Sequence, residues 1–472
     1  MNKRFKSALI TFILTGLIVI TISCSNSTQI AVKGAAATPV GGYISEDTTW
    51  AANNSPYEVT QDVIVEEGVL LSLEPGVEVR FSNQTELVVD GALNATGTSV
   101  SPIIFTSNAT TPMPGDWQGI YFREGAEDSL CVMNWTIVNY AYIGVVAHAS
   151  SPLIQNSRFE YNSHFGIESV VLFAFGDIAL PILQNCTFTH NGGFPDGGGH
   201  HGGIYATASG FINIENCAIE DNVGNGVDSN SGRANVTRSI IRNNMGTGVM
   251  GNVVIKDSEI TGNNQSGASI YGEVHYNSIY DNSPYDLVAT EDVNATFNWW
   301  GTTNETLIEE HIFDYYDDYD IGKVTYKPHI SSPYFVCDYE QIYEVQILSN
   351  SSITDFSFSK PAKSITFNAN GTTGTPGFCN ITIPAELMSG TFTLYKDDTQ
   401  LVEDADYTET YNETHYIFKI FYNHSIHTIK IVSTQAIPEL PTNLVTLLTV
   451  MSLSASTLFF RKKILRKNSK LQ

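Results

Sequence analysis

The chain has 472 residues, of which 49 are acidic and 24 basic, and its formal net charge is −25. This acidity argues against nucleic acid and anionic lipid as partners, and it leaves cations and neutral or basic polymers as candidates. Six cysteines in a chain of this length do not make a disulfide-stapled scaffold.

The N-terminus has the features of a signal peptide over residues 1–24. Three basic residues precede an apolar run, residues 8–22, that has the length of a signal-peptide core. The end of this run also resembles a loose lipobox, in which Cys24 would be acylated after cleavage. Thr21 stands where such a motif usually has an aliphatic residue, so ordinary cleavage is favoured. Residues 25–45, rich in small and polar residues, are expected to form a linker.

Residues 46–332 are expected to form a parallel β-solenoid. Between residues 63 and 93, apolar and polar residues alternate with period two, and glycine-containing turns separate the strands. Between residues 135 and 285, one phrase returns six times. It consists of a small residue, a variable residue, an aliphatic residue or Phe, two variable residues and Asn, followed by a glycine-containing stretch. The intervals between these asparagines, 19 to 31 residues, suit stacked coils.

The repeated asparagine predicts an amide ladder. Coils stack about 4.8 Å apart, so equivalent side chains of successive coils lie above one another. Asparagine and glycine also tolerate the left-handed backbone that a sharp corner requires, and we expect them to adopt it there. A run of unrelated hairpins would explain the alternation but not the constant asparagine register. The predicted ladder consists of Asn162, Asn191, Asn222, Asn244, Asn263 and Asn282.

Two cysteines occupy the small-residue position of the phrase. Cys186 and Cys217 stand there in successive copies, where neighbouring copies have serine. Stacked buried thiols are therefore expected, although the coil spacing would also permit a disulfide. Cys337 and Cys379 both follow the solenoid and are candidates for a disulfide in that region.

Five short stretches carry a family resemblance: residues 73–77, 89–93, 103–107, 117–120 and 298–302. The first four resemble the opening coils of right-handed parallel β-helix surface proteins of the pectin-lyase-like type, and the last, Asn-Trp-Trp-Gly-Thr, resembles their closing coil. The resemblance spans more than half the chain. It implies the fold and does not imply an activity.

The region after the solenoid is expected to hold a second domain and a membrane anchor. Residues 335–435 alternate at period two with frequent turns, which indicates a small antiparallel β-sandwich. Residues 444–460 are apolar or small and a basic tail follows them, which predicts a transmembrane helix with its tail in the cytoplasm. The whole is thus an all-β protein, a right-handed parallel β-helix followed by a β-sandwich, with a C-terminal transmembrane helix.

A short motif precedes that helix. Residues 437–441, Ile-Pro-Glu-Leu-Pro, resemble the Pro-Glu-Phe type of C-terminal sorting signal that archaeosortases process, except that Leu440 replaces the Phe. Residues 437–472 would then be the sorting signal with its helix and tail, and the resemblance implies an archaeal surface protein. About sixteen Asn-x-Ser/Thr sequons lie outside the signal peptide and are glycosylation candidates on an exported chain.

One insertion offers a candidate binding site. His190, Asp196, His200 and His201 bring three imidazoles and one carboxylate into a glycine-rich stretch, enough for a transition-metal site. Adjacent histidines on an extended backbone point in different directions, and flexible glycines do not preorganise ligands. A plain surface loop is therefore favoured, and no metal ligand or catalytic residue is assigned.

Carboxylates on the coils offer another candidate. Stacked carboxylates could bind Ca²⁺ or perform acid/base chemistry, but few basic residues accompany them, so a solvated acidic face is favoured. These residues are Glu160, Glu220, Asp221, Asp228, Asp257, Glu259 and Asp281. The acidic aromatic run over residues 314–320 resembles the tail that closes such helices and is expected to cap the solenoid.

The sequence therefore favours a non-enzymatic, membrane-anchored surface solenoid that binds a glycan or an envelope component. We expect no cofactor, and Ca²⁺ is the one candidate ion. The alternative is a polysaccharide lyase or glycoside hydrolase of the β-helix type. A third reading comes from a β-helix family that serves copper-enzyme maturation. It is disfavoured because the chain has only seven methionines and no evident Met/His cluster.

Overall fold

The computed structural model describes residues 37–171, 180–193, 201–330, 333–338 and 341–437. The expected signal peptide with Cys24, the transmembrane helix over residues 444–460 and nearly all of the sorting signal lie outside these ranges. Asp196 and His200 lie outside them as well. Within the described ranges, no helix has the length and hydropathy that crossing a membrane requires.

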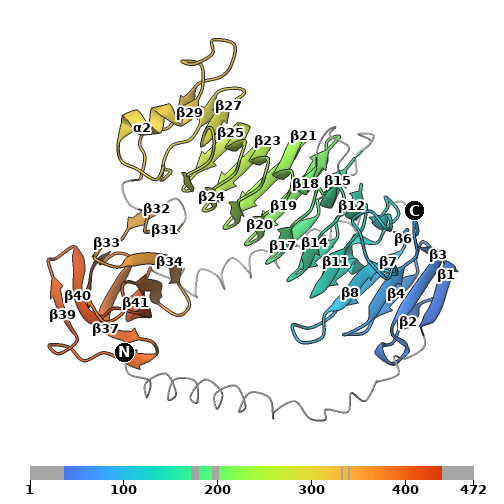
Figure 1. Cartoon of the computed structure of the whole chain (residues 1–472), viewed down its shortest axis with the longest axis horizontal. Coiled ribbons are helices and arrows are strands. Elements are labelled where there is room, and N and C mark those ends of the chain that lie inside the picture. The colour runs from blue at the N-terminus through green and yellow to red at the C-terminus, as the bar shows by residue number, and fades with distance from the viewer. Residues whose placement is uncertain (1–36, 172–179, 194–200, 331–332, 339–340, 438–472) are drawn as a thin grey trace, which may run out of the picture.

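A parallel β-solenoid extends from Thr38 to Thr325, and antiparallel sheets follow it. Figure 1 shows its strands stacked side by side from β1 to β29. Equivalent strands of successive coils pair in parallel and form three sheets. Twelve strands pair one after another in sheet 1, so the solenoid has twelve coils.

The strands of the three sheets are as follows. Sheet 1 contains β1 (Thr38–Ile44), β3 (Tyr57–Val65), β6 (Glu86–Val89), β9 (Gly119–Phe122), β12 (Ile143–His148), β15 (Phe165–Val170), β18 (Gly202–Thr207), β21 (Asn225–Thr237), β23 (Thr247–Lys256), β25 (Ser266–His275), β27 (Leu287–Ala289) and β29 (Ile312–Phe313). Sheet 2 contains β2 (Thr48–Trp50), β4 (Leu70–Leu73), β7 (Ala92–Thr96), β10 (Val132–Asn134), β13 (Leu153–Gln155), β16 (Ile182–Gln184), β19 (Phe211–Glu215), the second halves of β21, β23 and β25, β28 (Val293–Asn294) and β30 (Val324–Thr325). Sheet 3 contains the first halves of β1 and β3, then β5 (Glu78–Phe81), β8 (Ile103–Ser107), β11 (Thr136–Asn139), β14 (Arg158–Glu160), β17 (Thr187–Thr189), β20 (Ala218–Glu220), β22 (Ile240–Arg242), β24 (Glu259–Thr261) and β26 (Ser278–Tyr280).

Within the described residues, three short helices interrupt the coils: η1 (Ala52–Asn54), η2 (Asp128–Leu130) and α2 (Glu305–Glu310). The side chain of Asn304 caps α2 by accepting a hydrogen bond from the N–H of Thr306 (3.1 Å). None of the three helices alters the stacking of the coils around it.

The solenoid begins earlier than the expected boundary at residue 46. Strand β1 pairs in register with β3, with Val40 beside Val59 and Ile44 beside Val65. The side chains of Val40 and Ile44 pack against the core. Residues 38–45 therefore belong to the first coil and not to the linker. Their glycine- and proline-containing composition concealed the alternation of the strand.

The core of the solenoid is a stack of like residues. The register places inward residues above one another, and Ile219, Ile241, Ile260 and Ile279 are all fully buried in this way. Aromatic rings stack in the same way: the ring centroids of Phe81 and Trp117 are 3.9 Å apart, and those of Phe159 and Phe188 are 4.8 Å apart. Burying each large side chain stabilises the fold by about 1.5–3 kcal/mol.

The asparagines form a continuous buried ladder at the corner between sheets 3 and 1. The Oδ1 of Asn222 accepts hydrogen bonds from the backbone N–H and the Nδ2 of Asn191, both at 3.0 Å. Its Nδ2 donates to the carbonyl of Phe188 (3.0 Å) and to Oδ1 of Asn244 (2.9 Å). All hydrogen-bonding positions of the amide are thus used. The links between side chains measure 2.9 to 3.0 Å from Asn162 to Asn282.

The ladder ends on a carboxylate. Asn282 donates from its N–H and its Nδ2 to Oδ1 of Asp286, at 3.1 and 3.0 Å. Asp286 is buried, and burial raises the pKa of its carboxyl group despite these hydrogen bonds. Its other oxygen faces Nδ1 of His311 at 3.4 Å. A side chain that only accepts hydrogen bonds is the natural terminus of a chain of amide donors.

A second ladder follows the corner between sheets 2 and 3. Here a side-chain acceptor of one coil receives the backbone N–H of the preceding coil, through Ser157, Cys217, Ser239, Ser258, Asn277 and Asn298. Cys186 and Cys217 lie on successive coils of this ladder, and the N–H of Cys186 approaches Sγ of Cys217 at 3.4 Å. Both are buried free thiols without a disulfide between them.

The corners use asparagine and glycine as expected only in part. Asn243 and Gly262 are left-handed at the corner between sheets 3 and 1, and so are Asn156, Asn185 and Asn216 at the corner between sheets 2 and 3, but the ladder asparagines are not. The left-handed conformation falls on the residue before each ladder asparagine, for example Tyr161 (φ 55°), His190 (φ 56°) and Asp221 (φ 55°). The asparagine cannot adopt it, because its side chain must point along the ladder. Backbone hydrogen bonds between stacked corners hold these non-glycine residues in place, as from the N–H of His190 to the carbonyl of Asp221 (3.3 Å).

The glycine after each ladder asparagine serves close packing instead. A Cβ on Gly226 would lie 2.5 Å from the carbonyl oxygen of Gly248 and 3.0 Å from Nδ2 of Asn244. The same crowding recurs at Gly203 and Gly267 in other coils. These positions need glycine because the neighbouring coil leaves no room for a side chain.

Antiparallel sheets follow the solenoid, as expected for residues 335–435. One sheet contains β33 (Gln346–Ser349), β36 (Pro376–Pro384), β40 (His415–Asn423) and β39 (Tyr407–Tyr411), and the other contains β34 (Ser352–Ser359), β35 (Ser364–Asn370), β41 (Ile426–Ala436), β37 (Met388–Lys396) and β38 (Thr399–Gln400). A hairpin of β31 (Phe335–Asp338) and β32 (Gln341–Glu344) precedes them. Residues of both sheets share one hydrophobic core, which makes the domain a sandwich.

The expected disulfide between Cys337 and Cys379 is not formed. Cys379 is a free thiol in the core of the sandwich, and burial raises its pKa to about 12. The thiol of Cys337 instead hydrogen bonds Asp257 of the solenoid, a carboxyl group whose pKa is raised by burial. Nearness in the chain suggested the pairing, but the two cysteines lie on different elements with different surroundings.

The ladder generates a stability prediction. Asn222→Ala removes an acceptor from two donors of Asn191 and a donor from the carbonyl of Phe188, all of them buried. We expect a loss of about 2–4 kcal/mol in the free energy of unfolding, because buried polar groups without partners are costly. Thermal unfolding followed by circular dichroism measures it. Asn230→Ala, an exposed position of the same coil, is the control, and equal melting temperatures for both variants would contradict the prediction.

Candidate functional site

The outward side chains of sheet 1 distinguish this sheet from the other two. The register sets Tyr121, Val146, Glu168, Tyr205 and Asp228 beside one another on β9, β12, β15, β18 and β21. Because strand residues alternate, all five point away from the solenoid interior. A row of aromatic and acidic side chains therefore crosses five coils of this sheet.

A second aromatic row lies beside the first. Tyr142, His164 and His201 each immediately precede a strand of sheet 1. The rings of Tyr142 and His164 lie 4.0 Å apart between centroids, and those of His164 and His201 lie 6.2 Å apart in an edge contact. We call the surface formed by Tyr121, Tyr142, His164, Glu168, His201 and Tyr205 the sheet 1 face.

A depression continues this row towards the C-terminal coils. The positions that follow His201 are Gly224 and Gly246, which have no side chains, and a Cβ on Gly224 would lie 1.8 Å from the carbonyl oxygen of His201. The depression has a volume of about 360 Å³ and is lined by His201, Val223, Gly224, Asn225, Met245, Gly246, Met250 and Gln265. It brings two methionines near a histidine, a proximity that the sequence did not reveal.

The sheet 1 face rests on a small apolar cluster outside the solenoid core. Ile143, Val146 and Phe165 are buried although they point outward, and Tyr121, Val170 and Tyr205 pack against them. The rings of Phe165 and Tyr205 stack with centroids 4.7 Å apart. This packing gives the aromatic side chains a fixed apolar support.

Glu168 is an acidic residue that lies next to this apolar cluster. It lies between Val146 and Tyr205 in the register, and burial raises the pKa of its carboxyl group. The pKa of Tyr121 is raised to about 12, by burial first and then by the negative charges of Glu86 and Glu168. Tyr142 also contributes to that shift, so these groups lie within electrostatic range of one another.

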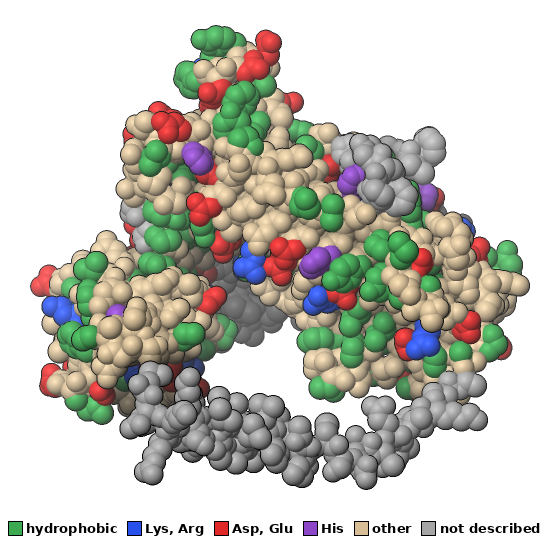
Figure 2. Space-filling view, viewed as in Figure 1, with side chains coloured by type: hydrophobic (Ala, Val, Ile, Leu, Met, Phe, Trp, Pro, Cys, Tyr) green, Lys and Arg blue, Asp and Glu red, His purple; other side chains and the backbone are tan. Residues whose placement is uncertain are grey.

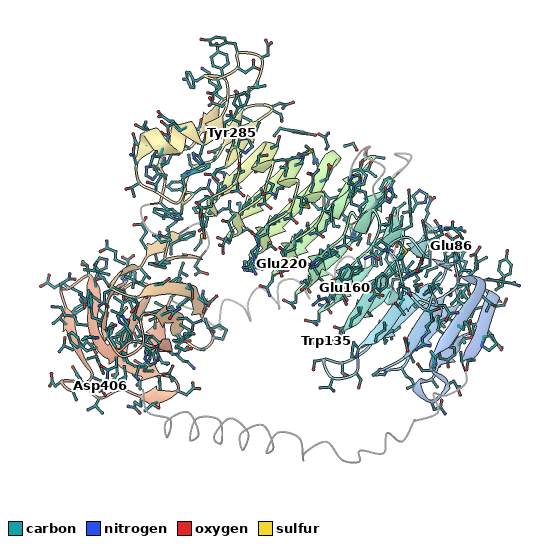
Figure 3. The ribbon with its side chains drawn as sticks, in the orientation of Figure 1. Glu86, Trp135, Glu160, Glu220, Tyr285 and Asp406 are labelled. Carbon is teal, nitrogen blue, oxygen red and sulfur yellow. The ribbon has the colours of Figure 1, made fainter. Side chains whose placement is uncertain are left out.

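On sheets 2 and 3, many outward charged and amide side chains pair with one another. On sheet 3, Arg158 pairs with Glu160, Arg242 pairs with Glu220 (2.8 Å), and the hydroxyl of Tyr280 donates to Glu259 (2.8 Å). Figure 3 shows Glu160 and Glu220 on the same side of the solenoid. Arginines thus neutralise two of the seven carboxylates expected on the coils, and Figure 2 shows basic and acidic side chains side by side along this side of the solenoid.

The remaining carboxylates of that set have structural positions. Asp221, Asp257 and Asp281 are the left-handed residues at corners of the coils. Asp228 is buried, and it accepts hydrogen bonds from Nδ2 of Asn225 and from the N–H of Asn230, both at 3.1 Å. These carboxylates do not form one ligand set, since they are divided between corners and strands.

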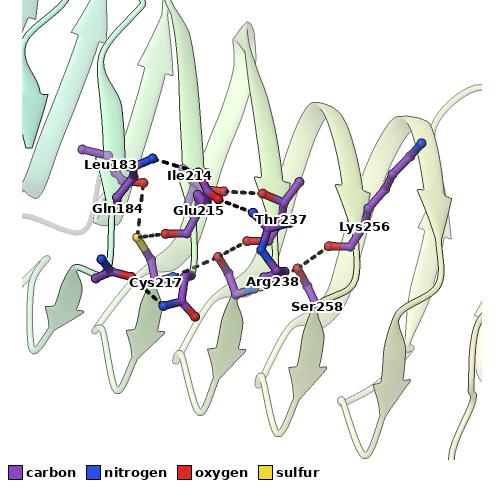
Figure 4. A network of polar contacts seen from close by, with 12 residues as sticks. Leu183, Gln184, Ile214, Glu215, Cys217, Thr237, Arg238, Lys256 and Ser258 are labelled. Carbon is purple, nitrogen blue, oxygen red and sulfur yellow. Dashed lines mark hydrogen bonds and ion pairs between the residues drawn. The ribbon is translucent and has the colours of Figure 1, made fainter. Parts of the chain in front are cut away.

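Sheet 2 presents a chain of side-chain hydrogen bonds. Gln184 accepts from Gln155 (2.6 Å) and donates to Glu215 (2.9 Å), which also pairs with Arg238. These contacts lower the pKa of Glu215, with the bond from Gln184 as the largest cause. Figure 4 shows this network continuing into the second ladder through Cys217 and Ser258.

Of the four residues of the candidate metal site, the structure describes His190 and His201, which occupy different positions on their coils. His190 is an exposed corner residue whose ring stacks on Tyr161 (5.0 Å) and whose Nδ1 meets Oγ1 of Thr189 (2.8 Å). His201 belongs to the sheet 1 face, and Asp196 and His200 lie outside the described residues. Over the ranges described above, no three His, Cys, Asp or Glu side chains are grouped as metal ligands.

Sequence reasoning did not select Tyr142, His164 or Glu168. A signal for Glu168 was present, because it is the one charged residue of β15 and stands at an outward position of the alternation. Tyr142 and His164 gave no such signal, since they are separated by 22 residues and meet only through coil stacking.

Comparison with family models agrees with the fold. Residues 42–170 match the model described as a pectate-lyase like beta helix domain, and residues 118–283 match the model described as a right handed beta helix region. Both matches fall on the solenoid. The chain therefore contains right-handed β-helix domains of the pectate-lyase-like type.

The individual proteins to which this chain is similar share little of its sequence. The chain is similar to Protein bark beetle of Drosophila melanogaster, with 28% identity over 144 residues, which is 26% of this chain, and it spans only 5% of that protein. A double mutant of the periplasmic alginate epimerase AlgG aligns at a TM-score of 0.35 and 13% identity, covering 56% of this chain and 70% of that one. A tailspike capsular polysaccharide depolymerase from Acinetobacter baumannii bacteriophage Fri1 aligns at a TM-score of 0.22 and 11% identity, covering 82% and 70%.

The buried environment of Glu168 generates a pH-dependent prediction. Because its pKa is raised in the native state, ionisation of Glu168 lowers stability as the pH rises through that pKa. We expect Glu168→Gln to have a higher melting temperature than the unsubstituted protein at pH 7.5. The difference should vanish towards pH 4, near the ordinary Glu pKa of about 4.3.

Glu215→Gln is the matched control. The pKa of Glu215 is lowered, so its ionised form stabilises the native state and the substitution should decrease the melting temperature at pH 7.5. Differential scanning calorimetry of both variants at the two pH values measures these effects. A decrease for Glu168→Gln at pH 7.5 would show that its carboxylate has a stabilising partner.

Proposed function

We propose that this protein is an exported, membrane-anchored surface solenoid that binds a glycan of the cell envelope or surroundings through the sheet 1 face. The observation that carries the proposal is the pair of parallel rows on this face, one with Tyr142, His164 and His201 and the other with Tyr121, Glu168 and Tyr205. Rows that repeat at the coil spacing suit an extended polymer of repeating units.

The chemistry of the rows suits sugars. The C–H surface of a sugar ring packs on an aromatic ring by dispersion and apolar burial, while hydroxyl groups seek hydrogen-bond partners at its edge. Tyr121, Tyr142 and Tyr205 provide such rings together with hydroxyl groups, and His164 and His201 add ring nitrogens. The match of residues 42–170 to a pectate-lyase like model supports a glycan as the class of ligand.

The contrast with the other faces supports the same choice. Sheet 2 and sheet 3 engage their charged and amide side chains in internal pairs. A ligand there would have to displace existing hydrogen bonds. The sheet 1 face offers the ring of Tyr142, which is 37% exposed, half-buried aromatic rings beside it, and a depression next to them, where Met245 is 57% exposed.

Membrane attachment rests on the sequence. The apolar run over residues 444–460 and the basic tail after it would anchor the protein, and the signal peptide would place the solenoid outside the cell. Processing by an archaeosortase at residues 437–441 and glycosylation of exposed sequons are further parts of this proposal.

A binding measurement tests the proposed face. Tyr142→Ala removes one aromatic ring from the row, and we expect glycan binding to weaken by at least about 1 kcal/mol, roughly fivefold in Kd. Trp135→Ala is the control, because Trp135 has the same exposure of 37% but lies at the corner between sheets 2 and 3. Glycan arrays followed by calorimetry provide the measurement, and equal losses in both variants would contradict a specific site.

A second candidate function is polysaccharide hydrolysis. The position of Glu168 beside the apolar cluster favours it, since burial there raises the pKa of its carboxyl group and a raised pKa suits a general acid. The binding samples distinguish the two functions. If new reducing ends form in these samples and Glu168→Gln abolishes them, the function of this face is catalysis and not binding.

Topology is testable independently. Protease added to intact cells should degrade the solenoid and the sandwich, while the tail after residue 460 of any unprocessed chain stays protected because the membrane shields it. Immunoblots with antibodies against each end measure the outcome, and cells opened by detergent provide the control. Protection of the whole chain in intact cells would contradict surface exposure.

A further inference from the structure

The charges around the sheet 1 face are almost all negative. Glu86 and Glu168 are close enough to Tyr121 to raise its pKa, and Asp62 adds its charge beside Glu86. The described strands of sheet 1 from β6 to the first half of β21, and the residues just before them, contain no Lys or Arg, and Arg123 directly follows β9. Arg123 lies 3.6 Å from Asp90, so much of its charge is already compensated.

This distribution excludes polyanions and favours cations. A chain of uronate units laid across the face would place its carboxylates near Glu86 and Glu168, where Arg123 is the nearby cation of the described residues and Asp90 already attracts it. Like charges inside the Debye length of about 8–10 Å repel at physiological salt. A ligand with ammonium groups would instead meet the carboxylate of Glu168, which has no Lys or Arg partner among the described residues, and that of Glu86, where burial and Asp62 outweigh the attraction of Arg123.

Glu168 has the position of a specific partner for such an ammonium group. It lies next to Tyr205 in the register, on the strand that begins directly after His164. Four residues of extended strand, about 13 Å, separate Glu168 from His164, so an oligosaccharide with one unit on the row of Tyr142 and His164 would place a later unit beside Glu168. Burial raises the pKa of Glu168, which indicates that its ionised form is poorly solvated and would gain from a cation.

We infer that the sheet 1 face selects amino-substituted glycans, meaning polymers whose sugar units carry a free ammonium group, and that Glu168 recognises this group. The inference rests on the proposed function and adds the class of ligand to it. Aromatic stacking would supply binding that is common to neutral and amino sugars, and the carboxylate would supply the discrimination between them.

The experiment uses the full-length chain in detergent and three tetrasaccharides: β-1,4-linked glucosamine, its N-acetylated form and tetragalacturonate. Calorimetry at pH 7 keeps most histidines neutral, since their ordinary pKa is about 6.5. We expect the glucosamine tetramer to bind at least about tenfold more tightly than its acetylated form, which is about 1.4 kcal/mol. We expect no binding of tetragalacturonate.

Glu168→Gln is the decisive variant. It should bring the Kd for the glucosamine tetramer to within about twofold of that for the acetylated form, while the acetylated form binds as before, because only the ion pair is removed. Glu220→Gln removes the same charge from sheet 3 and should leave the preference intact. A preference that survives Glu168→Gln, or is lost equally in Glu220→Gln, would overturn the assignment to Glu168.

The outcomes separate this inference from the function on which it rests. Binding of the acetylated tetramer that Tyr142→Ala weakens, without any preference for the ammonium form, would leave the proposed function standing and overturn the inference. Tetragalacturonate binding as tightly as the glucosamine tetramer would do the same. Failure of all three ligands to bind, with Tyr142→Ala indistinguishable from the unsubstituted chain, would overturn both.

Discussion

The asparagine ladder is the interaction on which the rest of this structure depends. Asn222, for example, accepts two hydrogen bonds from Asn191 of the coil before it and donates one to Phe188 of that coil and one to Asn244 of the coil after it, so its buried amide is fully paired. A coil displaced by one residue would lose these bonds and would turn its inward side chains to solvent. The ladder therefore sets the register of successive coils, and the row of glycines beside it allows their close approach.

A fixed register determines what the surface can present. Outward side chains of neighbouring coils stand in rows, so residues that are 20 to 40 positions apart in the chain become neighbours in space. On sheets 2 and 3 these rows are composed of partners that satisfy one another, such as Gln184 with Glu215 and Arg242 with Glu220. On sheet 1 the rows combine aromatic rings with an acidic group in an apolar setting. The same scaffold thus gives two faces that are internally paired and one that is suited to a ligand.

Ladder positions also show which polar chemistry a solenoid core tolerates. Serine, cysteine and asparagine all occupy the second ladder, because the position requires an acceptor of small volume for the N–H of the coil before it. Cysteine serves there as a weak acceptor, without any need for a disulfide. Asp286 ends the first ladder for a related reason, since a carboxylate accepts hydrogen bonds and donates none. The identity of each residue follows from its place along the ladder.

The sequence by itself determined the elements that depend on local periodicity. Alternation and the repeated Asn-and-Gly phrase specify strands, corners, the inward residues and the stacking of coils, because these properties are set within one coil and repeat. Tertiary structure alone decided which outward residues meet. Insertions change the spacing between copies, so the contacts of Tyr142 with His164 and of His164 with His201 cannot be read from intervals along the chain. The pairing of Arg158 with Glu160, the bond of Cys337 to Asp257 and the burial of Glu168 were decided in the same way, because charge neutralisation and desolvation depend on neighbours in space and not on neighbours in sequence.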